Sequence, residues 1–156
     1  MLAETAKTQS RETDASGRFS TFHVADLFFG IDVLCVQEVL RFQPMTRVPK
    51  SPDVIEGLMN LRGQIVTAID MRRLLNLPER KGSAQPMNVV IRTDDGAVSL
   101  LVDEIGDVLG LEHSAYEQPP GNLEPTARKL IRGVYKLDGK LLLVLDAERT
   151  VDIAVG

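Results

Sequence analysis

The chain is a succession of short apolar runs separated by Gly, Pro and Asp, and this spacing limits the folds available to it. No stretch carries the 3.6-residue apolar period of a long amphipathic helix, and β-branched residues are frequent in the runs. The runs typical of strands are 19–24, 27–36, 65–69, 88–93, 97–102, 134–137 and 140–145. Short, numerous strands predict an all-β fold, and barrels are favoured over a sandwich because each half of the chain holds few strands.

The stretch Ile55–Asp70 is the centre of this pattern, with the order strand, tight turn and strand. Asn60 and Gly63 bracket the turn, since both residue types tolerate positive φ better than others do. Arg62 lies between them with its charge free to point outward. Asp70 can then cap a short helical turn. We expect the rest of the chain to frame this hairpin and a second copy of it.

The two halves of the chain resemble each other in three short segments that keep their order. The pairs are Val36–Val39 with Val102–Ile105, Leu61–Gly63 with Ile131–Gly133, and Ala68–Asp70 with Val144–Asp146. Preserved order favours a duplication over chance. The physical consequence is two small barrels with a groove between them, and they should share a core because each is too small to bury much surface alone.

The polar start of the chain differs from the rest. Residues 1–17 have no hydrophobic period and are predicted to be a disordered tail, followed by one folded unit over 18–156. Within this unit the first barrel is expected at about 19–85 and the second at about 86–145, with strand exchange at the ends.

Composition excludes several classes of function. The net charge is −4, aromatic residues make up 4% and Trp is absent, so neither a basic nucleic-acid footprint nor a base-stacking platform is expected. The single cysteine, Cys35, excludes an intramolecular disulfide and fits a reducing compartment. No signal peptide and no apolar run long enough to span a bilayer are present. These features predict a soluble cytoplasmic protein without membrane insertion.

Residues that could carry catalysis are few and scattered. His23 and His113 are isolated, and no metal-binding spacing of His or Cys occurs, so no metal or other cofactor is expected. Cys35 lies within a predicted strand, where packing is its usual role. No pair of carboxylates stands out as an acid–base couple. The sequence therefore predicts a non-enzymatic protein that works through its surfaces.

Several motifs in fixed order resemble the CheW coupling proteins of bacterial chemotaxis. The first is Gly30–Val39, and Thr46–Pro49 follows it. The segment Ile55–Arg72 continues the match through the motif Gly-x-x-Asn-Leu-Arg-Gly, and Val102–Leu109 fits the second half. The similarity runs from about Phe19 to Val151, which is nearly the whole predicted folded unit.

The resemblance implies a fold and a role. The fold would be two SH3-like five-stranded β-barrels around a shared core, with short helical segments. The role would be a non-catalytic adaptor that joins the cytoplasmic tip of a chemoreceptor to the regulatory domain of the CheA histidine kinase, in arrays close to the membrane. The receptor tip is a helical hairpin and would lie in the groove between the barrels, in the helix-in-groove mode.

Individual residues follow from the same resemblance. The residues carried over to receptor binding are Val33, Val36, Glu38, Arg62 and Val98. The valines would supply an apolar anchor, and the arginine would suit a carboxylate on the receptor helix. The residues carried over to kinase binding are Glu56 and Gly57.

Two positions depart from the usual pattern of the family. Cys35 replaces a residue that is often charged and is expected to be half-exposed, and Ser99 stands where glycine is common. Both are expected near the groove, where they could alter receptor choice. Two alternatives remain: a CheW-like scaffold in another pathway, such as surface motility or second-messenger control, and a small-molecule-binding barrel.

Overall fold

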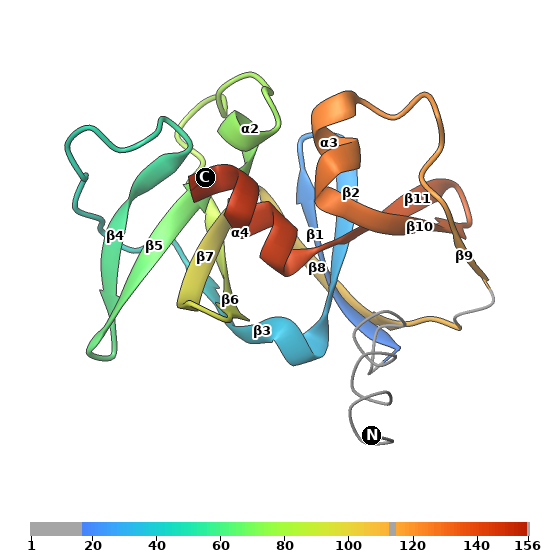
Figure 1. Ribbon diagram of the computed structural model, residues 1–156, viewed down its shortest axis with the longest axis horizontal. Coiled ribbons are helices and arrows are strands. Elements are labelled where there is room, and N and C mark those ends of the chain that lie inside the picture. The colour runs from blue at the N-terminus through green and yellow to red at the C-terminus, as the bar shows by residue number, and fades with distance from the viewer. Residues whose placement is uncertain (1–16, 113–114, 156) are drawn as a thin grey trace.

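The computed structural model describes residues 17–112 and 115–155, which form two β-sheets side by side (Figure 1). Short helices lie over the junction between them, α4 in front. The predicted disordered tail, apart from Gly17, lies outside the described residues.

The elements follow one another as short strands with few helical turns. The strands are β1 (Arg18–Val24), β2 (Leu27–Asp32), β3 (Val36–Arg41), β4 (Ile55–Leu61), β5 (Gln64–Asp70), β6 (Met87–Thr93), β7 (Gly96–Val102), β8 (Glu104–Gly110), β9 (Tyr116–Glu117), β10 (Ile131–Leu137) and β11 (Lys140–Leu145). The helical segments are η1 (Val33–Cys35), α2 (Met71–Leu74), α3 (Pro125–Leu130) and α4 (Ala147–Val155).

The two sheets have the same arrangement of strands. Barrel 1 has the order β3-β6-β7-β5-β4, and barrel 2 has the order β8-β1-β2-β11-β10-β9. Each contains one parallel pair, β5 with β7 and β2 with β11, while the other pairs are antiparallel. The predicted all-β fold of two barrels is confirmed, and barrel 2 differs only by the two-residue strand β9 along its edge.

The sequence analysis expected the barrels to divide the chain near residue 85 with strand exchange at the ends, and in the structure each half exchanges a whole hairpin. Barrel 1 is built from residues 36–102, and barrel 2 combines 18–32 with 104–145. The hairpin that begins each half completes the barrel of the other half: β1–β2 joins β8 and β11, and β6–β7 joins β3 and β5. The reason is the parallel pair in each barrel, β5 with β7 and β2 with β11. A parallel pair needs a long crossover, so strands that follow one another directly in the chain cannot form it.

The two halves repeat in the structure, but not all of the segments matched in the sequence occupy equivalent positions. The hairpins β4–β5 and β10–β11 each carry a bulge, which places Gly57 in the same position as Gly133, 76 residues apart. Ala68 and Val144 occupy equivalent positions at the same spacing. The predicted match at Ala68–Asp70 is therefore confirmed. The predicted match of Leu61–Gly63 with Ile131–Gly133 is wrong, because a short Arg-Gly pair recurs at two different places in the hairpin.

The two equivalent aspartates end the repeated hairpins as helix caps. Asp70 accepts hydrogen bonds through its Oδ1 from the backbone N–H groups of Arg72 and Arg73, at 2.9 and 3.3 Å. Asp146 accepts one from the N–H of Arg149 at 3.0 Å. A carboxylate at this position satisfies N–H groups that a helix start otherwise leaves unpaired. The predicted cap at Asp70 is thus confirmed.

A single large apolar cluster joins the two barrels. Phe22 and Phe29 enter it from barrel 2, Ile69 and Leu100 enter it from barrel 1, and α4 adds Val151. Two smaller clusters lie within one barrel each, around Tyr135 in barrel 2 and around Val66 in barrel 1. Because the largest cluster takes side chains from both sheets, neither barrel could bury its apolar surface alone.

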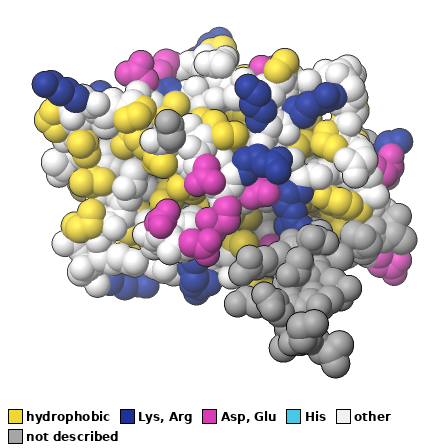
Figure 2. Space-filling model, in the orientation of Figure 1, with side chains coloured by type: hydrophobic (Ala, Val, Ile, Leu, Met, Phe, Trp, Pro, Cys, Tyr) yellow, Lys and Arg dark blue, Asp and Glu magenta, His cyan; other side chains and the backbone are white. Residues whose placement is uncertain are grey.

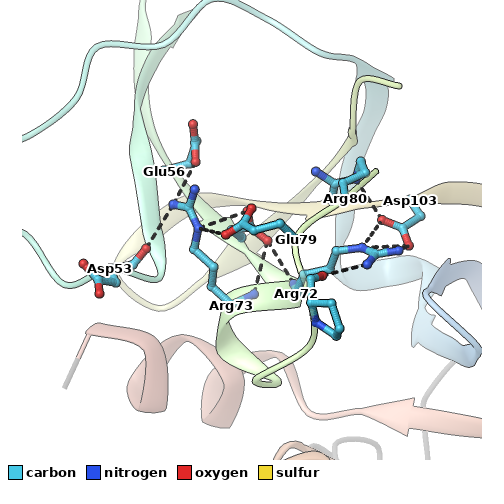
Figure 3. Close-up of polar contacts among 9 residues, drawn as sticks. Asp53, Glu56, Arg72, Arg73, Glu79, Arg80 and Asp103 are labelled. Carbon is cyan, nitrogen blue, oxygen red and sulfur yellow. Dashed lines mark hydrogen bonds and ion pairs between the residues drawn. The ribbon is translucent and has the colours of Figure 1, made fainter. Parts of the chain in front are cut away.

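Asp103 holds the joint where the chain passes from barrel 1 to barrel 2 (Figure 3). Its N–H donates to the carbonyl of His23 at 2.9 Å, and its carboxylate accepts from the N–H of Ala25 at 2.6 Å. Arg72 donates through Nε and NH2 at 3.0 and 2.7 Å, and Arg80 donates through Nε at 3.0 Å. Burial raises the pKa of Asp103, but these hydrogen bonds outweigh burial and hold the pKa at about 2.

The Asp103 joint makes a prediction about stability and pH. Asp103→Asn should lower the free energy of unfolding by about 2 kcal/mol at neutral pH, because two guanidinium groups lose their anionic partner. The folded pKa of Asp103 lies below its ordinary value of 3.8, so its stabilisation is present above that value and is lost as the pH falls toward about 2. The free energy of unfolding can be measured by urea denaturation at about pH 7 and about pH 3. Its change between the two pH values should be smaller for the variant than for the wild type.

The matched control is Asp138→Asn, which changes an exposed carboxylate in the β10–β11 turn. It should leave both the free energy of unfolding and its pH dependence close to wild type. Equal behaviour of the two variants would contradict the assigned role of Asp103.

Candidate functional site

Glu38 and Arg62 meet at one end of barrel 1. Arg62 NH1 lies 3.0 Å from Glu38 Oε2, and the arginine side chain is 78% exposed while that of the glutamate is 19% exposed. Glu38 belongs to β3 and Arg62 to the β4–β5 turn, so the ion pair links the two edge strands of the sheet. The structure therefore brings together the two charged residues that the sequence analysis assigned to receptor binding.

The turn that presents Arg62 differs in detail from the expected one. The positive φ values belong to Arg62 at 55° and Gly63 at 84°. Asn60 instead accepts a hydrogen bond through Oδ1 from the N–H of Gly63 at 2.9 Å. Two consecutive positive φ values are the signature of a tight two-residue hairpin, which suits the twist of the strands. This turn holds Arg62 at the tip of the hairpin, away from the core.

The three valines of the predicted receptor site differ in exposure. Val33 in η1 and Val36 at the start of β3 are half-buried. Val98 in β7 is only 9% exposed and belongs to the shared core. Ile91 pairs with both Val36 and Val98, so these two residues lie on either side of it. Val98 thus lies beneath the predicted receptor-binding surface and offers little exposed area to a partner.

Two strongly exposed apolar residues near this surface were not identified from the sequence. Leu34 in η1 is 60% exposed, and Ile65 at the start of β5 is 61% exposed. Arg92 fixes η1 by donating through NH1 to the carbonyls of Leu34 and Val36, at 3.3 and 3.2 Å. Large apolar side chains held in the open by rigid elements are typical of contact surfaces. The signal in the sequence was the strand period of two, which places Ile65 on the opposite face of β5 from the buried Val66.

A groove of about 360 Å³ lies between the two barrels. Its apolar lining includes Ile31 and Leu145 of barrel 2, and its charged lining includes Asp94 of the β6–β7 turn and Glu148 of α4. The N–H of Asp94 donates to Glu148 Oε2 at 3.2 Å, and this hydrogen bond connects the β6–β7 turn to α4. Burial, followed by the nearby charge of Asp94, raises the pKa of Glu148. Figure 2 shows acidic side chains gathered near the middle of the face that carries α4.

Cys35 and Ser99, the two residues that depart from the usual family pattern, differ in their position relative to this groove. Cys35 is half-buried and lines it, as expected. Ser99 is fully buried in β7, where its hydroxyl donates to Asn88 Oδ1 at 2.7 Å. The expectation that Ser99 lies near the groove is wrong, because its side chain is buried against Asn88 and does not line the groove.

Gly57, assigned to kinase binding, has a structural reason to be glycine. Thr46 and Leu58 exchange two backbone hydrogen bonds of 2.8 Å, which attach the proline-rich segment before β4 to the edge of that strand. A Cβ on Gly57 would lie 2.7 Å from the carbonyl oxygen of Thr46, well inside contact distance. Gly57 therefore permits this close approach of two backbones.

Glu56, the other residue assigned to kinase binding, is half-buried and paired. Its Oε1 lies 3.0 Å from Arg73 NH1. Glu56 is near the start of β4, and Arg62 directly follows the end of the same strand. Glu56 and Arg62, one from each set of predicted contact residues, thus lie at opposite ends of one hairpin.

The remaining candidates for chemistry have structural roles or lie outside the described part of the chain. His23 packs its ring against Phe28, with centroids 4.7 Å apart. His113 lies outside the described residues. Over residues 17–112 and 115–155 there is no group of three or more His, Cys, Asp or Glu side chains that could hold a metal ion. In the same ranges no helix has the length and apolar character needed to cross a membrane.

Comparisons with known proteins give a consistent result. The model of the CheW-like domain family matches residues 18–154. The chemotaxis protein CheW of Bacillus subtilis is 30% identical over 141 residues, which cover 90% of each chain. The chemotaxis protein CheW of Klebsiella aerogenes is 32% identical over 133 residues, which cover 84% of this chain and 79% of the relative.

A solved structure agrees with the sequence comparisons. The crystal structure of the scaffolding protein TtCheW from Thermoanaerobacter tengcongensis superposes with a TM-score of 0.74 at 25% identity. The superposition covers 83% of this chain and 88% of that protein.

The close contact at Gly57 makes a prediction about the proline-rich segment. Gly57→Ala should lower the free energy of unfolding by about 2 kcal/mol, because the new methyl group would push the Thr46 backbone away from β4. Amide hydrogen exchange should show faster exchange at Thr46 and Leu58, whose N–H groups would lose their acceptors.

Gly110→Ala in β8 is the matched control, since a Cβ there meets nothing within 4 Å. It should change stability by less than about 0.5 kcal/mol. If the two substitutions had equal effects, the contact with Thr46 would not be the reason for glycine at position 57.

Proposed function

This chain belongs to the CheW-like family, and we propose that it is a non-catalytic adaptor that couples chemoreceptor tips to the regulatory domain of a CheA histidine kinase. The observation that carries the proposal is the match of one family model to residues 18–154, which include both barrels and the groove between them. The names of the relatives, a chemotaxis protein and a scaffolding protein, support a role in assembly rather than catalysis.

The receptor is proposed to contact the end of barrel 1 at Arg62 and the neighbouring groove. A helical hairpin presents rows of side chains that suit a surface with one exposed cation and flanking apolar residues. Arg62 offers the cation, and Leu34 and Ile65 offer apolar area. Glu38 holds the guanidinium in place from the neighbouring edge strand. The half-buried valines Val33 and Val36 would complete the apolar part of the contact.

The kinase is proposed to contact the opposite end of the β4–β5 hairpin, around Glu56 and Gly57. Separate faces are needed if one small adaptor is to hold two partners at the same time. The two ends of β4 meet this requirement, because Glu56 lies near its start and Arg62 follows its end. Individual contacts of this size are expected to be modest, so strength would come from many copies in one array. The proposed location is cytoplasmic, at membrane-proximal receptor arrays.

Charge reversal at Arg62 tests the receptor contact. Arg62→Glu should weaken binding of a purified receptor-tip fragment by at least about tenfold, because it replaces the exposed cation with an anion that would repel a carboxylate on the receptor helix. The free energy of unfolding should change by less than about 1 kcal/mol, since the pair is exposed. Calorimetric titration of the fragment and thermal unfolding of both proteins would measure the two effects.

Lys136→Glu is the matched control, because Lys136 is also an exposed cation in a surface ion pair, at 3.5 Å from Glu117 in barrel 2. It should leave receptor binding within about twofold of wild type. Full receptor binding by Arg62→Glu would overturn the assignment of this surface.

The partners themselves can be identified by capture from a lysate with wild type and Arg62→Glu as baits. Recovery of a chemoreceptor and CheA by wild type, with the receptor absent from the variant, is the expected result. Recovery of a different receptor or kinase would place the chain in another signalling pathway. Recovery of neither, together with a bound metabolite in native mass spectrometry, would favour a small-molecule-binding barrel.

A further inference from the structure

Arg73 connects four segments of barrel 1 (Figure 3). Its NH1 lies 3.0 Å from Glu56 Oε1 in β4, and it donates to the carbonyl of Asp53 at 3.2 Å. Its Nε lies 3.3 Å from Glu79 Oε1 and 3.7 Å from Asp70 Oδ2. One guanidinium group therefore holds the start of β4, the segment before it, the cap of α2 and the loop after α2.

The electrostatics explain why an arginine occupies this position. Burial lowers the pKa of Arg73, but the charges of Asp70 and Glu56 and the hydrogen bond to Glu79 outweigh it, so the pKa is raised. A planar guanidinium can serve several oxygens in fixed directions, whereas an ammonium group acts as a point charge. The side chain is 29% exposed, so most of its surface is already covered within the chain.

The neighbouring residues form a second ion-pair cluster that fixes the same loop. Arg72, next to Arg73 on α2, pairs with Asp103, and Arg80, next to Glu79 in the loop, pairs with the same carboxylate. Figure 3 shows that these two clusters lie side by side along α2. The loop after α2 is thus held by both clusters, and only the Arg73 cluster includes Glu56. Arg80, which holds the same loop without contacting Glu56, can therefore serve as a control for Arg73.

We propose that Arg73 is a positioning residue of the kinase-docking face, acting through Glu56. It holds the Glu56 carboxylate in one orientation and keeps the segment that ends at Asp53 against β4, so that a partner meets a preformed surface. The inference rests on the proposed function, which assigns Glu56 to the kinase. Preformed contact residues raise affinity because less conformational freedom is lost on binding.

A double-mutant cycle tests whether Arg73 acts through Glu56. The probe is the purified regulatory domain of a CheA kinase, titrated into the full chain by calorimetry. Arg73→Gln and Glu56→Gln should each weaken binding by about tenfold, and the double variant should be no weaker than either single one. Arg73→Lys should recover only part of the affinity, because lysine cannot hold the four oxygens at once.

Arg80→Gln is the matched control, since it removes an arginine that anchors the same loop without touching Glu56. Its affinity for the kinase domain should be within about twofold of that of the wild type. All variants should bind a receptor-tip fragment as wild type does, which shows that barrel 1 and the groove remain folded.

The possible outcomes separate this inference from the proposed function. Equal loss of kinase binding in Arg73→Gln and Arg80→Gln would overturn the inference, because general loosening of the loop would then be sufficient. Additive losses in the double variant would also overturn it, since Arg73 would then contact the kinase directly. Wild-type affinity in Arg73→Gln would overturn the inference while the adaptor function stands. Failure of the wild type to bind either probe would overturn the proposed function itself.

Discussion

The exchange of hairpins between the two halves is the constraint on which the rest of the structure depends. Each barrel closes through a parallel pair, β5 with β7 and β2 with β11, whose strands come from different halves of the chain. The largest apolar cluster then takes side chains from both sheets, including Phe29 and Leu100. Barrel 1 and barrel 2 should therefore unfold together. Separating the barrels would expose this cluster, and separating the two halves of the chain would break the parallel pair in each sheet.

The joint at Asp103 follows from this exchange. The chain must cross from β7 in barrel 1 to β8 in barrel 2 within one residue, and that residue is Asp103. So short a crossing leaves the relative placement of the barrels sensitive to local contacts. Two arginines and the N–H of Ala25 converge on the carboxylate there, and the groove lies between the two barrels that they connect. The contacts at Asp103 thus stabilise the point where the chain connects the two barrels.

The sequence predicted the local features well and the distant ones poorly. Most predicted strands, the Asp70 cap and the turn at Arg62 depend on neighbouring residues, and the structure contains them. The predicted strand 27–36 is wrong at its end, because β2 ends at Asp32 and residues 33–35 form η1. The boundary between barrels was wrong because a hairpin carries no local sign of which edge it will join. Ser99 was misplaced for a related reason, since only the pairing of β6 with β7 brings Asn88 to its hydroxyl. Arg73 was not singled out from the sequence, because its partners lie in four separate segments.

In the proposed function, the two arginine–glutamate pairs of barrel 1 have different roles. Arg62 and Glu38 are 3.0 Å apart, as are Arg73 and Glu56, yet Arg62 is 78% exposed and Arg73 only 29%. An exposed arginine contributes little to folding, so its charge remains available to a partner. A covered pair with further acceptors is held in one geometry, and its loss disturbs the surface around it. Exposure, more than distance, therefore separates a contact residue from a residue that positions a contact.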